Sequence, residues 1–135
     1  MARAQASERW ISAGAGWMAL AVATGALGAH TLAPHFVAER GAEWWGKAVL
    51  YHVLHALGLL AYGLFLRGRE QRAWPAWCFA LGIALFSGSL YALALGAPRW
   101  LGMITPFGGT IWIGAWIGFA VQARGAYPRS PEGTR

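Results

Sequence analysis

Four long apolar stretches occupy most of this 135-residue chain and limit what it can fold into. Each approaches or exceeds the roughly 20 residues that a helix needs to cross the hydrocarbon core of a bilayer. Charged residues make up only 12% of the chain, about half of their share in an ordinary soluble domain. The sequence therefore predicts an all-α integral membrane protein, a bundle of four helices in a single domain at residues 10–123. The predicted helices cover residues 10–32, 45–66, 74–96 and 101–122.

The basic residues lie at the ends of these stretches, where they set the topology of a membrane protein. If the turn RGREQR at residues 67–72 faces the cytoplasm, both chain ends do as well. The opposite side then keeps only Arg40, Lys47 and Arg99. We therefore expect a multi-pass protein of the inner (cytoplasmic) membrane, with a cytoplasmic N-tail at residues 1–9 and a disordered cytoplasmic C-tail at residues 124–135. The expected cytoplasmic arginines are Arg3, Arg9, Arg67, Arg69, Arg72, Arg124, Arg129 and Arg135.

The formal net charge of +6 would favour a nucleic-acid partner if the protein were soluble. Here the charges are divided among helix ends rather than gathered on one folded face, so we expect no nucleic-acid partner. The expected partner is the lipid bilayer, joined by another membrane protein or by a second copy in a homodimer. The single cysteine, Cys78, excludes an internal disulfide.

Small residues within the apolar stretches predict where the helices touch. Lipid tails are as apolar as leucine, so membrane helices associate through close packing of their backbones. The third stretch carries a small residue at every fourth position from Ala80 to Gly96, and the fourth carries a GxxxG spacing that suits a dimer as well as an internal contact. We see no heptad pattern. The predicted packing positions are Gly25, Gly28, Ala84, Gly88, Ala92, Gly108, Gly109, Gly114 and Gly118.

Polar side chains within the apolar stretches gather toward the predicted non-cytoplasmic side. His52 and His55 are three residues apart and therefore project from one side of their helix. A neutral imidazole in hydrocarbon needs hydrogen-bond partners, because an unmatched polar group there costs several kcal/mol. Tyr91 and Ser87 are the first partners that the sequence offers. The predicted polar or ligand-binding cluster is His30, Tyr51, His52, His55, Ser87, Tyr91 and Thr105.

Four motifs in this order resemble the signatures of a known family. They are GALGAH, YHVLHALGLL, LFSGSLYALAL and TPFGGTIWIGAW, and they cover the chain from about Trp17 to Phe119. These motifs are similar to those of the YgdD-like small inner-membrane proteins (domain of unknown function 423) and of the eukaryotic transmembrane protein 256. The resemblance implies a four-helix integral membrane protein, and it implies no established reaction or ligand.

Two interpretations of the histidines stay open. In the first, they form hydrogen bonds between helices, and the protein is a non-catalytic accessory or interaction protein of the cytoplasmic membrane. In the second, the protein is a small transport or cofactor-binding protein in which His30, His52 and His55 handle protons, a metal ion or haem. Three imidazoles suit zinc or copper, but the chain contains no aspartate and its glutamates lie outside the apolar stretches. We therefore expect no metal ion and no haem.

The segment Ser87-Gly88-Ser89 is a further candidate for chemistry. It lacks the strand–turn–helix setting and the acid that a serine nucleophile requires. We therefore expect no enzymatic activity and no catalytic residues.

Overall fold

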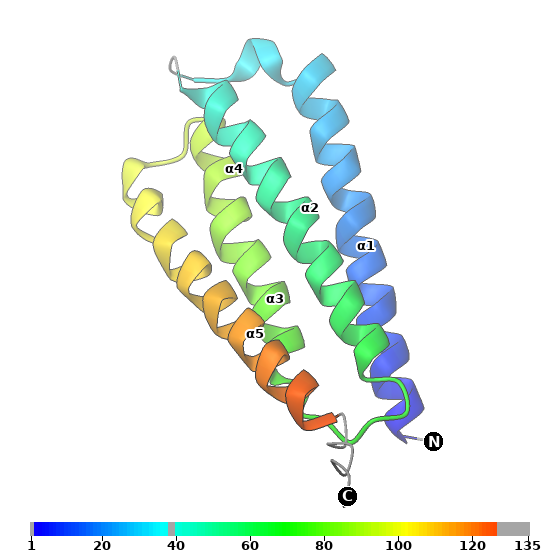
Figure 1. Cartoon of the computed structure of the whole chain (residues 1–135). Helices are drawn as coiled ribbons and strands as arrows, with labels where there is room; N and C mark the ends of the chain where they lie inside the picture. The colour runs from blue at the N-terminus through cyan, green and yellow to red at the C-terminus, as the bar shows by residue number, and fades with distance from the viewer. Residues whose placement is uncertain (1, 38–39, 127–135) are drawn as a thin grey trace, which may run out of the picture.

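Four helical spans follow one another up and down in the computed structural model, which describes residues 2–37 and 40–126 (Figure 1). All four are long and apolar enough to cross a membrane, and the described residues contain no strand. The predicted all-α fold with four membrane-spanning helices is thus confirmed. The third span combines three segments, because a π-helical turn, η2, separates α3 from α4. The helical segments of all four spans are α1 (Ala2–His30), α2 (Gly41–Phe65), α3 (Trp74–Gly82), η2 (Ile83–Ser87), α4 (Gly88–Ala94) and α5 (Thr105–Ala126).

The spans lie side by side, with α1 at one edge and α5 at the other (Figure 1). The helix α1 packs chiefly against α2, α2 packs against the third span, and the third span packs against α5. Two short 3₁₀ segments, η1 (Ala33–His35) and η3 (Arg99–Met103), lie in the connections at the end opposite the start of α1. As a result, α2 is a central helix with neighbours on two sides.

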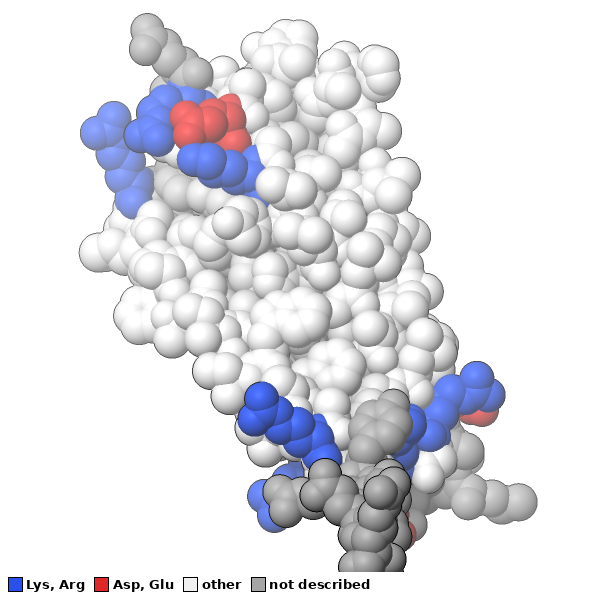
Figure 2. Space-filling view, in the orientation of Figure 1, with Lys and Arg blue, Asp and Glu red and all other residues white. Residues whose placement is uncertain are grey.

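Charged side chains gather at the two ends of the molecule and leave an uncharged belt between them on the face shown in Figure 2. Because the number of spans is even, α1 begins and α5 ends at the same end (Figure 1). The opposite end carries Arg40, Lys47 and Arg99, as expected. Which end faces the cytoplasm rests on the positive-inside bias and stays a prediction.

The helix ends differ from the predicted ones where polar residues continue a helix beyond the apolar stretch. The helix α1 begins at Ala2 instead of residue 10, so most of the expected N-tail is helical. In the same way α5 continues to Ala126, and the remainder of the expected disordered C-tail, residues 127–135, lies outside the described residues. Hydropathy marks the part of a helix that suits lipid, and a helix formed by polar residues can extend past it into water.

The contact between α1 and α2 follows a seven-residue repeat of small residues that the sequence analysis missed. Ser7, Gly14, Ala21 and Gly28 are all buried. A Cβ atom at Gly14 would lie only 2.6 Å from the backbone nitrogen of Leu60, so only glycine allows this approach. A repeat of seven keeps one face of a helix toward its partner. It escapes notice because heptads are usually recognised by large apolar residues.

The small-residue stripe on the third span does not form the predicted helix contact. Ala84 is exposed, Ala92 is half-buried, and a Cβ atom at Gly88 would meet nothing within 4 Å. Residues four apart on an α-helix advance by about 40° per step, so a stripe of this spacing winds away from any one neighbour. The contact face is instead built from larger residues, among them Phe79 and Ile83, which are almost fully buried.

The other predicted packing glycines divide into two groups. A Cβ atom at Gly114 would meet nothing within 4 Å, so this glycine faces away from the bundle. The remaining five lie against side chains or backbone of a neighbouring segment. These pairs are Gly25 with Val49, Gly28 with Trp45, Gly108 and Gly109 with Phe86, and Gly118 with Trp74.

Candidate functional site

A chain of hydrogen bonds joins three helices in the membrane-spanning region. His52, on the buried face of α2, places its Nδ1 atom 3.2 Å from the hydroxyl oxygen of Tyr91 on α4. The same hydroxyl lies 3.0 Å from Oγ1 of Thr24 on α1. Thr24 also donates to the carbonyl of Ala21, at 3.0 Å. One proton order satisfies all three contacts: Nδ1–H donates to Tyr91, Tyr91 to Thr24, and Thr24 to the carbonyl.

The same level of the bundle holds a second link between α1 and α2. The indole N–H of Trp45, on α2, donates to the carbonyl oxygen of Thr24 at 3.0 Å. The rings of Trp45 and Tyr91 lie next to each other, with centroids 4.6 Å apart. Thr24 is therefore held by its side chain and its carbonyl, and it fixes α1 against both α2 and α4.

His55 contacts a different neighbour from His52 and joins α5 to the bundle. Its ring stacks on the indole of Trp112, with centroids 3.5 Å apart and an angle of 6° between the planes. Its Nδ1 atom lies 2.8 Å from the carbonyl oxygen of Tyr51, which can only accept, so Nδ1 carries the proton. The indole N–H of Trp112 donates to the carbonyl of Phe79 at 3.1 Å. This group ties together α2, α3 and α5.

The structure therefore separates the three histidines of the predicted cluster. His52 contacts Tyr91 and Trp17, His55 contacts Trp112, and His30 is exposed at the end of α1. Because α2 is central, two histidines three residues apart can contact different neighbouring helices. Within residues 2–37 and 40–126, no three side chains of histidine, cysteine, aspartate or glutamate gather closely enough to hold a metal ion.

The hydroxyl-bearing members of the predicted cluster occupy two further places. Thr105, at the start of α5, lies 2.7 Å from the hydroxyl of Ser89, which donates to the carbonyl of Phe86. Ser87 lies in η2, is fully buried, and its Oγ atom has no hydrogen-bond partner among the described residues. Tyr51 is 39% exposed and stacks its ring near Trp112. Thr105 thus pairs with Ser89 rather than with a histidine.

Sequence reasoning missed Thr24, Ser89 and Trp112 as members of these networks. A signal for Thr24 was present, because it lies three residues after Ala21 and four before Gly28, both on the buried small-residue repeat. No local signal marks Trp112 as the partner of His55, since the two residues are far apart in the chain.

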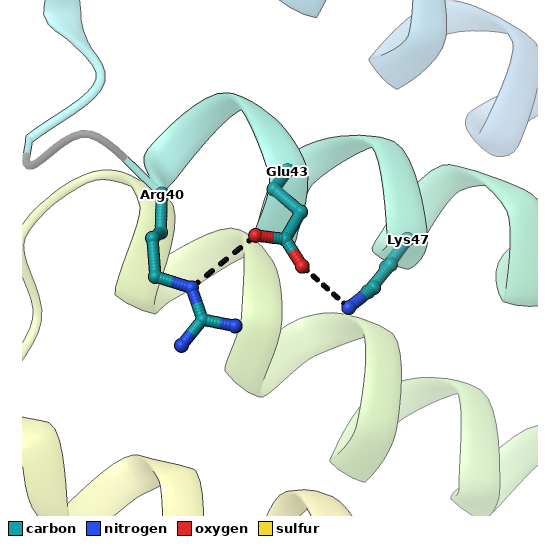
Figure 3. Close-up of polar contacts among 3 residues, drawn as sticks. All are labelled: Arg40, Glu43 and Lys47. Carbon is teal, nitrogen blue, oxygen red and sulfur yellow. Dashed lines mark hydrogen bonds and ion pairs between the residues drawn. The ribbon is translucent and has the colours of Figure 1, made fainter.

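A groove opens at the end of the molecule that carries Arg40, Lys47 and Arg99. It has a volume of about 1010 Å³ and lies between the start of α2, the α4 region and the start of α5. Beside it, Glu43 accepts from Nε of Arg40 at 3.2 Å and from Nζ of Lys47 at 2.6 Å (Figure 3). The residues that line the groove are Arg40, Trp44, Phe86, Leu90, Leu93, Arg99, Gly102, Thr105 and Pro106.

Four apolar spans joined by hydrogen bonds between helices define a small multi-pass integral membrane protein. Residues 24–109 match the family model described as "Protein of unknown function (DUF423)", and the chain belongs to this family. The matched region begins at Thr24 and includes His52, His55, Ser87, Tyr91 and Thr105.

Curated relatives of the chain are named as membrane proteins. A UPF0382 membrane protein of Staphylococcus epidermidis is 43% identical over 99 residues, which cover 73% of this chain and 80% of that protein. YwdK of Bacillus subtilis is 40% identical over 77% of this chain and 86% of its own length. The inner membrane protein YgdD of Escherichia coli is 38% identical over 76% of this chain and 79% of its own length. No solved structure matches the chain significantly.

Proposed function

We propose that this protein is a non-catalytic accessory protein of the cytoplasmic membrane, which acts by contacting another membrane component. In this proposal its buried polar side chains hold the helices in register and carry out no reaction. The observation that supports it most is the hydrogen-bonded chain from His52 through Tyr91 to Thr24, which engages one group from each of three helices.

The separation of the histidines also supports a structural role. The ring of His55 is covered by Trp112, and its Nδ1 proton is engaged by a backbone carbonyl. Hydrogen bonds between membrane helices contribute about 0.6 kcal/mol on average, so no single bond holds the bundle together. These hydrogen bonds instead select one arrangement of the helices, because each bond can form at only one register.

The contact role is supported by the outer face of α5. Ile113, Ile117 and Val121 are all about 60% exposed, and Gly114 between them has open space above it. A glycine flanked by protruding apolar side chains suits the close approach of another membrane helix. The partner in this proposal is another membrane protein or a second copy of this chain.

The alternative, a small transport or cofactor-binding protein, has one observation in its favour. The Nε2 atom of His52 and the Oγ atom of Ser87 are buried and have no hydrogen-bond partner among the described residues. Buried polar atoms without partners are uncommon and can mark a ligand or a bound water.

Metal analysis and visible absorption of the purified protein separate the accessory role from the cofactor-binding role, and a flux assay in liposomes tests transport. Metal analysis and visible absorption should show no stoichiometric metal ion or chromophore, and His52→Phe and His55→Phe should lower only the thermal stability. One metal ion or haem per chain, lost in folded forms of both variants, would instead establish the cofactor role.

Photo-crosslinking in cells tests the contact role. A photoreactive residue at Gly114 should yield one discrete protein adduct, whereas the same residue at Leu64, which is exposed on α2, should yield only lipid adducts. Lipid adducts alone at both positions would contradict the contact proposed for this face.

A further inference from the structure

The groove beside Arg40 combines a long apolar wall with charged groups at one end. Phe86, Leu90 and Leu93 of the third span form the wall, and Thr105 and Pro106 form the opposite side. Its volume of about 1010 Å³ lies at the upper end of the range for sites that enclose a drug-sized ligand, about 300–1,000 Å³. The groove is therefore large enough for a polar headgroup together with part of an acyl chain.

Positive charge dominates the mouth of this groove. Arg99 lines it and forms no ion pair with any described residue. Arg40 uses its Nε atom to bind Glu43, while its two terminal nitrogens point away from that carboxylate (Figure 3). Glu43 is also engaged by Lys47, and it is the one described carboxylate at the end that carries Arg40, Lys47 and Arg99.

The charged mouth and the apolar wall lie at the levels expected for the two parts of a lipid. Trp44 lines the groove beside Arg40, whose guanidinium carbon is 5.9 Å from the indole centroid. Trp100, which is 56% exposed, lies next to Arg99 in the chain. Tryptophans of this kind mark the headgroup level of a bilayer, and the wall from Leu93 to Phe86 runs from there into the hydrocarbon.

We propose that this groove binds one anionic phospholipid from the adjacent leaflet. The guanidinium groups of Arg40 and Arg99 hold the headgroup phosphate, for which the planar fork of arginine is well suited. One acyl chain lies against Phe86, Leu90 and Leu93. A free phosphate ion would leave this apolar wall without a ligand, and a zwitterionic lipid would leave the positive charge uncompensated. The site is independent of the accessory role proposed above.

Native mass spectrometry of the full-length protein in detergent tests the proposal. Phosphatidylglycerol should bind at one saturable site and more tightly than phosphatidylcholine with the same acyl chains. Arg40→Gln and Arg99→Gln should each weaken phosphatidylglycerol binding about tenfold, since each removes charge-assisted hydrogen bonds to the phosphate. Arg67→Gln and Arg124→Gln each remove one positive charge at the opposite end of the molecule and should leave phosphatidylglycerol binding unchanged.

A second pair of variants tests whether the groove itself is occupied. A Cβ atom at Gly102 would lie 3.8 Å from Cδ1 of Leu93, an ordinary contact, so we expect the side chain of Gly102→Leu to extend into the groove beside Leu93. This variant should abolish the saturable site, while Gly16→Leu, at an exposed position with open space, should retain it. A thermal melt of each variant verifies that it is folded.

Four results would overturn the proposal. Equal binding of the two phospholipids would show that the site does not recognise the charge of the headgroup. Equal weakening of phosphatidylglycerol binding by Arg67→Gln and Arg99→Gln would show only a general attraction between the lipid and a positively charged protein. Undiminished binding in Gly102→Leu would place the lipid outside the groove. Glycerol phosphate that binds as tightly as the lipid would show that the acyl chain takes no part.

Discussion

The Nδ1 atom of His52 lies 3.2 Å from the hydroxyl oxygen of Tyr91, across the contact between α2 and α4. The same hydroxyl reaches Thr24, so a single oxygen atom connects the edge helix α1 to the centre of the bundle. The hydrophobic effect does not favour one arrangement of apolar helices over another inside a bilayer. Directional bonds and close packing must therefore select the native register, and in this bundle they occur together on α1.

Close packing of α1 on α2 predicts opposite outcomes at two glycines two residues apart. Gly14→Ala should lower the free energy of unfolding by about 1–3 kcal/mol, because its Cβ atom would meet the backbone of Leu60. Gly16→Ala meets nothing within 4 Å and should be neutral or slightly stabilising, since alanine favours a helix more than glycine does. Unfolding in a denaturing detergent measures both. Equal effects would contradict the α1–α2 register described here.

The stack of His55 on Trp112 predicts that this tryptophan anchors α5. Trp112→Phe should lower the free energy of unfolding by about 2 kcal/mol, because it removes the hydrogen bond to the Phe79 carbonyl and part of a buried ring. Trp100→Phe, at a position that is 56% exposed, is the matched control and should change stability by less than about 0.5 kcal/mol. If both substitutions lowered the free energy of unfolding equally, Trp112 would not anchor α5 to the bundle.

The orientation in the membrane can be tested without altering any charge. In a Cys78→Ala background, Thr31→Cys places a thiol at the exposed end of α1, and Gln5→Cys places one at its start. In intact cells, a membrane-impermeant maleimide should label the thiol at position 31 and should reach position 5 only after the membrane is permeabilised. The reverse pattern would show that the positive-inside bias misassigns this protein.

The sequence predicted the spans well because hydropathy depends only on local composition. Each of the four apolar stretches corresponds to one helical span. The first three predicted helices overrun the observed spans, which end at His30, Phe65 and Ala94, by one or two residues, and polar residues continue a helix at Ala2 and Ala126. Tyr91 was also a foreseeable partner of His52, since a tyrosine and a histidine at one membrane level can satisfy each other.

The arrangement between helices was far less accessible from the sequence. The spacing of His52 and His55 shows that they project from one side of α2, but it does not show that different helices receive them. The π-helical turn at residues 83–87 has no clear local signal, and it changes which side chains of the third span face α5. The small-residue stripe that includes Ala84 was predicted to be a helix contact for the same reason. Its spacing identifies one face of the helix but does not identify a helix that packs against that face.

A double-mutant cycle at His52 and Tyr91 tests the central claim, that the intramembrane histidine joins helices. Tyr91→Phe alone should lower the free energy of unfolding by about 1–2 kcal/mol, because it removes the contacts to His52 and Thr24. Tyr51→Phe, whose ring is 39% exposed, serves as the matched control and should have little effect. Combined with His52→Phe, the cycle should give a coupling energy of about 0.5–1.5 kcal/mol. Strictly additive effects of the two changes would show that His52 and Tyr91 do not hold the helices together and would contradict this account.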